Sequence, residues 1–511
     1  MANSQATTMA TNSSAAPLNL PVTSFALCLA VFMQVLDGTI ANVALPTIAG
    51  ELGASASQST WIITAFVVCN AITLPLTGFL AKTFGEVKLF VACTFLFVVT
   101  SFLCGIATGL HELVLFRALQ GAVAGPMYPL TQSLMISIYP SNKRGSALAT
   151  LAMVTTVAPV AGPILGGWIT SNYAWGWIFF INVPLGLLAS AVVYLQMRHR
   201  PQSKVLQKVD YIGLITLIVG IGALQIMLDL GNERDWFADD LIITLSIIAA
   251  IGLSLFVYWE LTTQNPIVDL GLLFKHRNFG LGTLCLMLGF AAFFGINLLI
   301  PLWAQQVLRY DQLWTGWVAA PMGILPIIFA PILGRYANRL DMRWLATFAY
   351  LVFAATSFWR AHFNTEISAS YIAFTQFILG LGVACFFMPL LTILMSDLSG
   401  SEIASGSGVQ AFLRQVGSSF ATSLTIYFWQ HRSIIHHADL AVHINPQNHA
   451  AMQTIALFDD PQRGLASINQ LIDQQAAQMA FNDYLYMLGW IFLSLVVLVW
   501  LTKRVDPNKH H

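Results

Sequence analysis

Two charged side chains stand inside long apolar stretches of this sequence, and they are the strongest candidates for chemistry. Asp37 lies within the stretch 25–46, and Arg117 lies within 111–137. A charge near the centre of a bilayer costs about 2.5–3.5 kcal/mol on insertion scales, so a charged residue in a spanning helix marks a functional site. A buried guanidinium also needs a counter-charge or several hydrogen-bond acceptors. Asp37 is therefore a candidate proton-binding carboxylate, and Arg117 is its candidate partner.

Depth along the helix axis supports this pairing. Both residues lie roughly 9–12 Å from the same end of their stretches at 1.5 Å per residue. We expect them to be neighbours, or to be joined through Gln34 or Gln120. Two interpretations follow: a static ion pair, or a carboxylate whose proton affinity changes as the guanidinium approaches and withdraws. Small and polar residues share a helical face with each charge, which favours the second interpretation.

The composition shows which elements must position these residues. The 511 residues are 57% hydrophobic and 9% charged, whereas soluble domains carry about 25% charged residues. We therefore predict an all-α integral membrane protein with about fourteen spanning helices of about 20 residues each. The predicted spans are 23–45, 58–81, 88–108, 111–137, 146–170, 177–197, 211–230, 241–260, 280–302, 313–336, 344–361, 369–396, 404–429 and 484–503.

The distribution of lysine and arginine predicts the orientation. With a cytoplasmic N-terminus, the cytoplasmic segments contain sixteen of these residues and the opposite segments contain five. The positive-inside rule then places both termini in the cytoplasm. Residues 1–22 are polar and uncharged, and we predict that they are disordered.

Several classes of function are excluded. The net charge of zero gives no footprint for nucleic-acid binding. The apolar spans contain no phosphate loop, HExxH motif or Ser/His/Asp set, so we expect no enzyme activity, cofactor or metal. Without a nucleotide-binding domain, any work across the membrane must be driven by an ion gradient or a partner chain.

Two glycine-containing motifs favour roles in helix packing and movement. Gly-Pro-x-x-Gly-Gly in the fifth span predicts a kink and a flat face for close helix approach, although ordinary small-residue packing has the same pattern. The turn between the second and third spans is either a gating loop or a plain cytoplasmic turn, in which a lysine and a glutamate are close enough to pair. The residues of these motifs are Gly162, Pro163, Gly166 and Gly167, and Gly78, Lys82, Gly85 and Glu86.

Two further charges have several interpretations. Arg414 lies near the midplane of the span 404–429, on one face with Gln410, and it either pairs statically, attracts anions or couples movement. Asp229 ends the seventh span, where it either caps the helix at the interface or takes part in proton handling.

These stretches together resemble the major facilitator superfamily, in its branch of fourteen-span drug:proton antiporters. LDGTIANVALP at 36–46 is similar to the first-helix motif, LVLFRALQGAVAG at 113–125 to the helix-four motif, and AGPILGGW at 161–168 to the antiporter motif. The segment 78–90 stands in the place of the family's loop motif between helices two and three, and WGWIFFINVPLG at 175–186 is typical of the branch. Lys82 stands where the family usually has an acid, and Glu86 stands where it has a base, so the charge-relay interpretation of this loop does not transfer directly. Ala158 stands where a glycine is common.

The resemblance implies a domain order. A six-helix bundle at 23–197 precedes a basic linker with two inserted helices at 198–279 and a second bundle at 280–503. The second bundle includes a long periplasmic segment, 431–481, which either docks a partner or is a passive loop. The tail is 504–511.

The resemblance also implies a function. It is the proton-driven export of hydrophobic or amphipathic toxic compounds from a bacterial inner membrane, with a periplasmic adaptor and an outer-membrane channel as partners. The alternatives are an exporter of fatty acids or other amphipathic anions, and a uniporter or importer of a small nutrient.

In this hypothesis Asp37, Arg117 and Asp229 handle protons, and the substrate binds between the bundles near the midplane, in contact with lipid. The candidate lining residues, chosen by helix face, are Gln34, Asn42, Trp61, Asn70, Gln120, Tyr128, Asn297, Gln376, Gln410 and Arg414.

Overall fold

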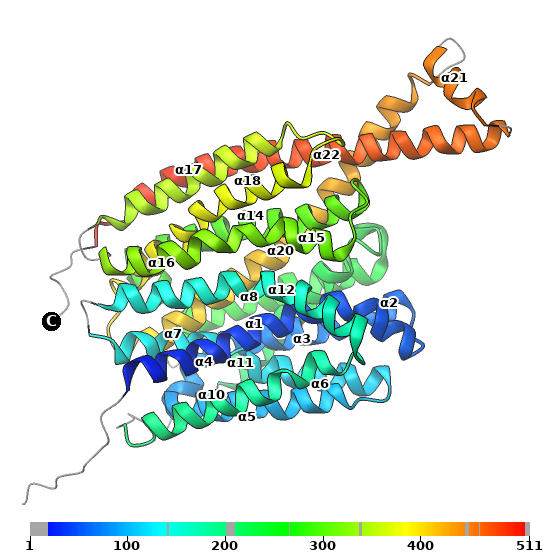
Figure 1. Ribbon diagram of the computed structural model, residues 1–511. Coiled ribbons are helices and arrows are strands. Elements are labelled where there is room, and N and C mark those ends of the chain that lie inside the picture. The colour runs from blue at the N-terminus through cyan, green and yellow to red at the C-terminus, as the bar shows by residue number, and fades with distance from the viewer. Residues whose placement is uncertain are drawn as a thin grey trace, which may run out of the picture.

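The computed structural model describes residues 19–140, 143–200, 210–264, 266–336, 340–444, 449–458 and 460–505, and every regular element in these ranges is a helix. The predicted all-α class is therefore confirmed. The helices lie side by side, and α1 begins at the same end of the molecule as α22 ends (Figure 1). We call this end the terminal end, and we call the opposite end the hairpin end.

The helices fall into a first half, an inserted pair and a second half. The first half contains α1 (Leu20–Glu51), α2 (Ala56–Ser59), α3 (Trp61–Thr73), α4 (Thr77–Phe84), α5 (Glu86–Gly105), α6 (Leu110–Ala124), α7 (Met127–Ile138), α8 (Arg144–Asn172), α9 (Trp177–Phe180) and α10 (Asn182–Met197). The inserted pair is α11 (Tyr211–Leu230) and α12 (Asp240–Thr262), joined through the short helix η2 (Trp236–Ala238). The second half contains α13 (Leu272–Lys275), α14 (Arg277–Gln306), α15 (Gln312–Ala319), η3 (Ala320–Gly323), α16 (Ile324–Tyr336), α17 (Met342–Arg360), α18 (Ala369–Ala384), α19 (Phe387–Met395), α20 (Ile403–Ala441), α21 (His449–Ala456) and α22 (Pro461–Trp500).

Most of the predicted spans are recognisable from length and apolarity alone. Nine helices in the described ranges are long and apolar enough to cross a membrane, and two bent helix pairs raise the number to eleven. The remaining predicted spans coincide with α6–α7, α17 and α20. Each of these carries buried polar groups, such as Arg117 in α6, Arg360 in α17 and Gln410 in α20. Those groups lower the hydropathy of helices that the bundle nevertheless encloses.

Prolines break several spans. α3 and α4 meet at 62° around Pro75, and α8 bends by 42° between Pro159 and Ile164. A proline ring removes one helical hydrogen bond and clashes with the preceding turn, which accounts for both bends. Gly162 and Pro163 of the antiporter motif lie within the second break.

Packing divides the spans into two bundles. In the first bundle, α1 packs against α8 and α10, while α3 and α5 pack against α6. In the second bundle, α14 packs against α19, α20 and α22, and α17 packs against α18 and α22. The pair α11–α12 lies outside both bundles and reaches them through α11, which touches α3 and α20. The domain boundaries at 198 and 279 stay predictions.

The seam between the bundles is closed at the terminal end. A Cβ atom at Gly78 of α4 would lie 2.7 Å from the Cα atom of Ser405 in α20. A Cβ atom at Gly334 of α16 would lie equally close, 2.7 Å, to the Cα atom of Ser146 in α8. Only glycine allows two backbones to approach this closely. The two bundles therefore meet backbone to backbone at this end.

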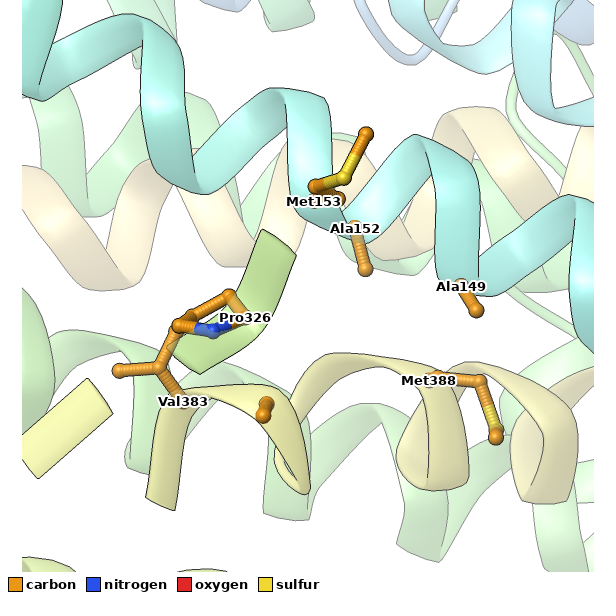
Figure 2. A pocket seen from close by; sticks show the side chains of 7 residues that line it. Ala149, Ala152, Met153, Pro326, Val383 and Met388 are labelled. Atoms are coloured by element: carbon orange, nitrogen blue, oxygen red, sulfur yellow. The ribbon is translucent and has the colours of Figure 1, made fainter. Parts of the chain in front are cut away.

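A small apolar pocket lies on the same seam (Figure 2). It forms where α8 of the first bundle faces α16, α18 and α19 of the second. Its lining residues are Ala149, Ala152, Met153, Pro326, Val383, Ala384 and Met388.

Two long helices extend beyond the others at the hairpin end, with α21 at the tip (Figure 1). α20 has 39 residues and α22 has 40, so each is roughly 60 Å long, about twice the thickness of a bilayer core. Arg432 and His436 of α20 both bond to Asp483 of α22 and fasten the two helices together. The segment 431–481 is therefore largely a helical hairpin, and its docking role stays a prediction.

Gly121 of α6 provides a test of the first bundle's packing. A Cβ atom there would lie 2.9 Å from the Cα atom of Phe66 in α3. Gly121→Val should push the two helices apart and destabilise the protein by about 1–3 kcal/mol, which lowers the thermal unfolding midpoint. The control is Gly167→Ala, because a Cβ atom at Gly167 meets nothing within 4 Å. Equal midpoints for the two variants would contradict this packing.

Candidate functional site

Asp37 of α1 and Arg117 of α6 form a direct ion pair inside the first bundle. Arg117 Nη1 lies 2.6 Å from Asp37 Oδ2, and the side chain of Arg117 is 1% exposed while that of Asp37 is 0% exposed. α1 brings Asp37 to this point because the opposite face of the helix is apolar and α8 and α10 pack around it. The pair is fully enclosed by protein.

Two amides complete the environment of the carboxylate. Gln120 donates to Asp37 Oδ1 at 3.1 Å, and Asn182 of α10 donates to the same oxygen at 2.7 Å. The Asn182 amide also donates to Ser101 of α5 at 3.0 Å. Asp37 thus accepts from three side chains on two other helices. This arrangement suits an ionised carboxylate.

Asn182 was not among the residues selected from the sequence. It lies in the segment 175–186, which was noted only for its resemblance to the antiporter branch. The signal that identifies it is an amide inside an apolar span, since such groups need partners at depth. Its partner could not be assigned without knowing that α10 packs against α1.

The guanidinium of Arg117 is held from several sides. It donates through Nε to the carbonyl of Ile62 at 3.2 Å and through Nη1 to Gln120 Oε1 at 2.6 Å. Its central carbon lies 4.2 Å from the ring centroid of Phe66 and 5.5 Å from that of Phe179. Arginine faces that stack on aromatic rings gain a cation–π attraction that is largest without water. Arg117 therefore joins α3 to the carboxylate site.

Asp229 lies apart from this pair. It is half-buried near the end of α11, where it accepts a hydrogen bond from Thr64 of α3. No described contact joins it directly to Asp37. Thr64 follows Ile62 by two positions, so Asp229 and the Asp37–Arg117 pair both contact the same turn of α3.

A second polar group bridges the two bundles. Gln410 of α20 donates to Gln132 of α7 at 2.9 Å, and both side chains are 0% exposed. The remaining polar atoms of this pair, Gln132 Nε2 and Gln410 Oε1, have no partner among the described residues. Three further buried side-chain atoms also have no hydrogen-bond partner among the described residues: Gln34 Oε1, Thr131 Oγ1 and Ser407 Oγ.

Arg414 lies one turn beyond Gln410. Its guanidinium stands 4.4 Å from the ring centroid of Tyr128 in the first bundle and 5.0 Å from that of Phe290 in the second. Among the described residues, no carboxylate forms a salt bridge with it. This half-buried cation between the bundles thus has aromatic neighbours and, in the part of the chain that the structure describes, no salt-bridge partner.

The other predicted lining residues are scattered. Gln34 donates to the Ala124 carbonyl at 2.9 Å, and Asn297 donates to Phe293 within α14 at 2.8 Å. Gln376 accepts from Arg360 at 2.7 Å inside the second bundle. Asn70 is buried on α3, whereas Asn42 and Trp61 are exposed. Of the predicted lining residues, Gln120 lies beside the ion pair. Three others, Tyr128, Gln410 and Arg414, lie at the seam between the bundles.

Two of the three glycines in the antiporter motif, Gly162 and Gly166, lie against α1. Gly162 faces Thr39, and a Cβ atom at Gly166 would lie 3.1 Å from the Ile40 carbonyl. Gly167 faces open space, and the Pro163 side chain lies outside the described residues. This face of α8 therefore contacts the helix that carries Asp37.

In the turn between α4 and α5, Gly85 adopts a φ of +88°, which favours glycine. Glu86 accepts from Ser133 of α7 at 3.0 Å, and the described salt bridges do not include a Lys82–Glu86 pair. Glu86 therefore ties the start of α5 to α7.

Comparison with known proteins identifies the class. A profile of the Major Facilitator Superfamily matches residues 27–422. Solved structures share the fold: the proton:xylose symporter XylE has a TM-score of 0.61 at 11% identity, covering 96% of this chain and 97% of its own. The human organic anion transporter MFSD10 has a TM-score of 0.57 at 12% identity, with coverages of 94% and 99%. This chain belongs to the Major Facilitator Superfamily, and it is a multi-pass membrane transporter rather than an enzyme.

Relatives with similar sequences place the chain in a smaller group within the superfamily. The chain is 48% identical to the multidrug export protein EmrB of Haemophilus influenzae over 494 residues, which cover 95% of this chain and 96% of that protein. It is 47% identical to the fatty acid resistance protein FarB of Neisseria gonorrhoeae over 486 residues, with coverages of 94% and 95%. These relatives include EmrB-type multidrug export proteins, so the predicted resemblance to the drug-exporting branch of the superfamily is confirmed.

A double-mutant cycle tests the energetics of the ion pair. Arg117→Gln alone leaves the Asp37 carboxylate buried without its counter-charge and should destabilise the protein by about 3–5 kcal/mol. Adding Asp37→Asn replaces the buried charge with an amide and should restore part of that loss. Unfolding midpoints of the wild type, both single variants and the double variant measure the coupling. Additive effects would show that the two groups do not interact.

Proposed function

We propose that this chain is a proton-driven antiporter that exports hydrophobic or amphipathic toxic compounds across a bacterial inner membrane. The buried Asp37–Arg117 ion pair is the observation that carries the proposal. A static pair gains little over apolar packing, because both charges lose their hydration. A carboxylate that binds a proton during the cycle requires this placement. The relatives that are named as multidrug export proteins support the cargo class.

The proton cycle follows from the contacts of Asp37. When Arg117 and the amides surround it, the carboxylate is ionised and its charge is compensated. A shift of α3 or α6 that draws Arg117 away removes this compensation, and the carboxyl then takes up a proton. A proton enters from the periplasm and leaves to the cytoplasm, and the opposite movement of substrate completes the cycle. Asp229, which contacts the same turn of α3, is a candidate second proton-handling group.

The orientation assigns the terminal end to the cytoplasm and the hairpin end to the periplasm, as the lysine and arginine count predicts. The cytoplasmic seam is then closed at Gly78 and Gly334. The α20–α22 hairpin reaches into the periplasm, where it suits the docking of an adaptor that leads to an outer-membrane channel. We propose that the glycines of α8 let α1 slide when the bundles move, and that the α4–α5 turn with Lys82 and Glu86 shapes the cytoplasmic gate.

The contacts of Arg414 favour one substrate class. A cation that lies between two aromatic rings and forms no salt bridge with any described carboxylate is suited to the acidic headgroup of an amphipathic molecule. The similarity to a fatty acid resistance protein agrees with this preference. Amphipathic anions such as fatty acids are therefore our second candidate cargo, ahead of a small nutrient.

The coupling role of Asp37 can be tested in proteoliposomes. Asp37→Asn keeps the shape of the side chain and one acceptor oxygen, which can still accept from Gln120 and Asn182, but its NH2 group cannot accept from Arg117 and it removes the group that exchanges a proton. Efflux driven by a pH gradient should be lost, whereas exchange of substrate at equal pH should persist. The control is Asp239→Asn, because Asp239 caps α12 and asparagine caps a helix equally well. Gradient-driven efflux at the wild-type rate in Asp37→Asn would overturn the assignment.

The preference for anions can be tested at Arg414. Arg414→Gln should weaken transport of a fatty acid by about ten- to a hundredfold, since one charge-assisted contact contributes about 1.5–3 kcal/mol. Transport of a cationic dye by the same variant should stay within about twofold of the wild type. Equal losses for both cargoes would mean that Arg414 supports the fold instead of selecting charge.

A further inference from the structure

The inserted pair is more than a lipid-facing addition to the two bundles. α12 exposes large apolar side chains along its length, among them Ile247, Ile251 and Leu255, which is typical of a helix in lipid. α11 lies between α12 and the core, and it contacts both α3 of the first bundle and α20 of the second. The inserted helix therefore covers the seam near the hairpin end.

The contacts of α11 with the two bundles differ in kind. α11 packs more extensively against α3 than against α20, and the Asp229–Thr64 hydrogen bond adds to its packing on α3. Its contact with α20 is concentrated at its end: Asn232 Nδ2 donates to the Ser423 carbonyl at 3.1 Å, and Ser423 Oγ donates to the Leu228 carbonyl at 2.7 Å. Packed helix faces move together, whereas a few terminal hydrogen bonds can break.

The turn after α11 is built to hold this end contact. Asp235 and Trp236 have φ angles of 50° and 54°, a left-handed conformation that residues other than glycine rarely adopt. Trp236 donates through Nε1 to Asn232 Oδ1 at 3.1 Å, and its ring meets Tyr427 of α20 edge-on at 5.9 Å. The strained turn thus orients the Asn232 amide toward Ser423.

The same turn of α3 holds both α11 and the ion pair. Ile62 accepts from Arg117, and Thr64, two positions later, bonds to Asp229. A movement of α3 that alters Arg117 must therefore also move α11. The end of this same helix α11 is hydrogen-bonded to Ser423 of α20.

We propose that Asn232 and Ser423 form a latch across the seam at the hairpin end, and that α11 moves with the first bundle and engages or releases the second. This proposal rests on the proposed transport function in one respect, because it assumes that the bundles separate at this end during the cycle. The latch gives the inserted pair a positioning role: it couples the α3 turn that holds Arg117 to the opening of the seam.

Reversible cross-linking tests the latch. In Asn232→Cys/Ser423→Cys, an oxidatively formed disulfide should lower substrate flux by about tenfold, and reduction should restore it, because the link fixes one of two required arrangements. The control pair is Met227→Cys/Ser246→Cys, which links α11 to α12 at an observed contact and should leave the flux unchanged. Full flux through the oxidised Asn232–Ser423 pair overturns the proposal. The readout is substrate flux, so loss of its dependence on the proton gradient would refute antiport without touching the latch.

A second measurement does not depend on transport. Spin labels at Glu51 of α1 and Gln430 of α20, both exposed near the hairpin end, report the separation of the bundles. In a background with Cys69 replaced by serine, Asn232→Ala should shift the distances between the labels to longer values. Ser246→Ala, which removes two hydrogen bonds that both lie inside the inserted pair, is the control. An unchanged distance distribution in Asn232→Ala would contradict a latch.

Discussion

The ion pair between Asp37 and Arg117 is the constraint on which the first bundle depends. Burying two charges away from water costs several kcal/mol for each ion after relaxation, and their attraction offsets this only with close contact and further hydrogen bonds. The bundle supplies both, through Gln120, Asn182 and the Ile62 carbonyl. Five helices, α1, α3, α5, α6 and α10, are thereby fixed around one carboxylate.

This dependence explains how a local event can reach the seam. Interiors packed at high density transmit displacements because they cannot absorb them locally. Gly121 lets α6 contact the α3 backbone, so Arg117 and α3 form one body. α11 packs against that body and reaches α20, while the bundles stay in backbone contact at Gly78 of the terminal end. In our account, protonation of Asp37 shifts the equilibrium between contact of the bundles through α11 and α20 and contact of the bundles at Gly78.

The sequence predicts the all-α class and the spans, because about 20 apolar residues suffice to define a membrane helix. It also predicts Asp37 and Arg117 as candidates, since charges at depth are rare. It could not place Gln376, whose helix face suits a substrate site but whose amide binds Arg360, a residue from another helix. Asn182 and the Asn232–Ser423 contact depend likewise on which helices become neighbours. Periodicity gives the face of each helix, and only packing gives its partner.

Proton release on substrate binding is the most direct test of the central claim. Purified protein in weakly buffered detergent solution is mixed with a fatty acid or a cationic dye, and the pH of the solution is followed beside that of Asp37→Asn. The account predicts release by the wild type and none by the variant, because substrate binding favours the arrangement in which Arg117 compensates the Asp37 charge, and the carboxyl then gives up its proton. Equal release by both proteins would place the coupling proton elsewhere and contradict the account.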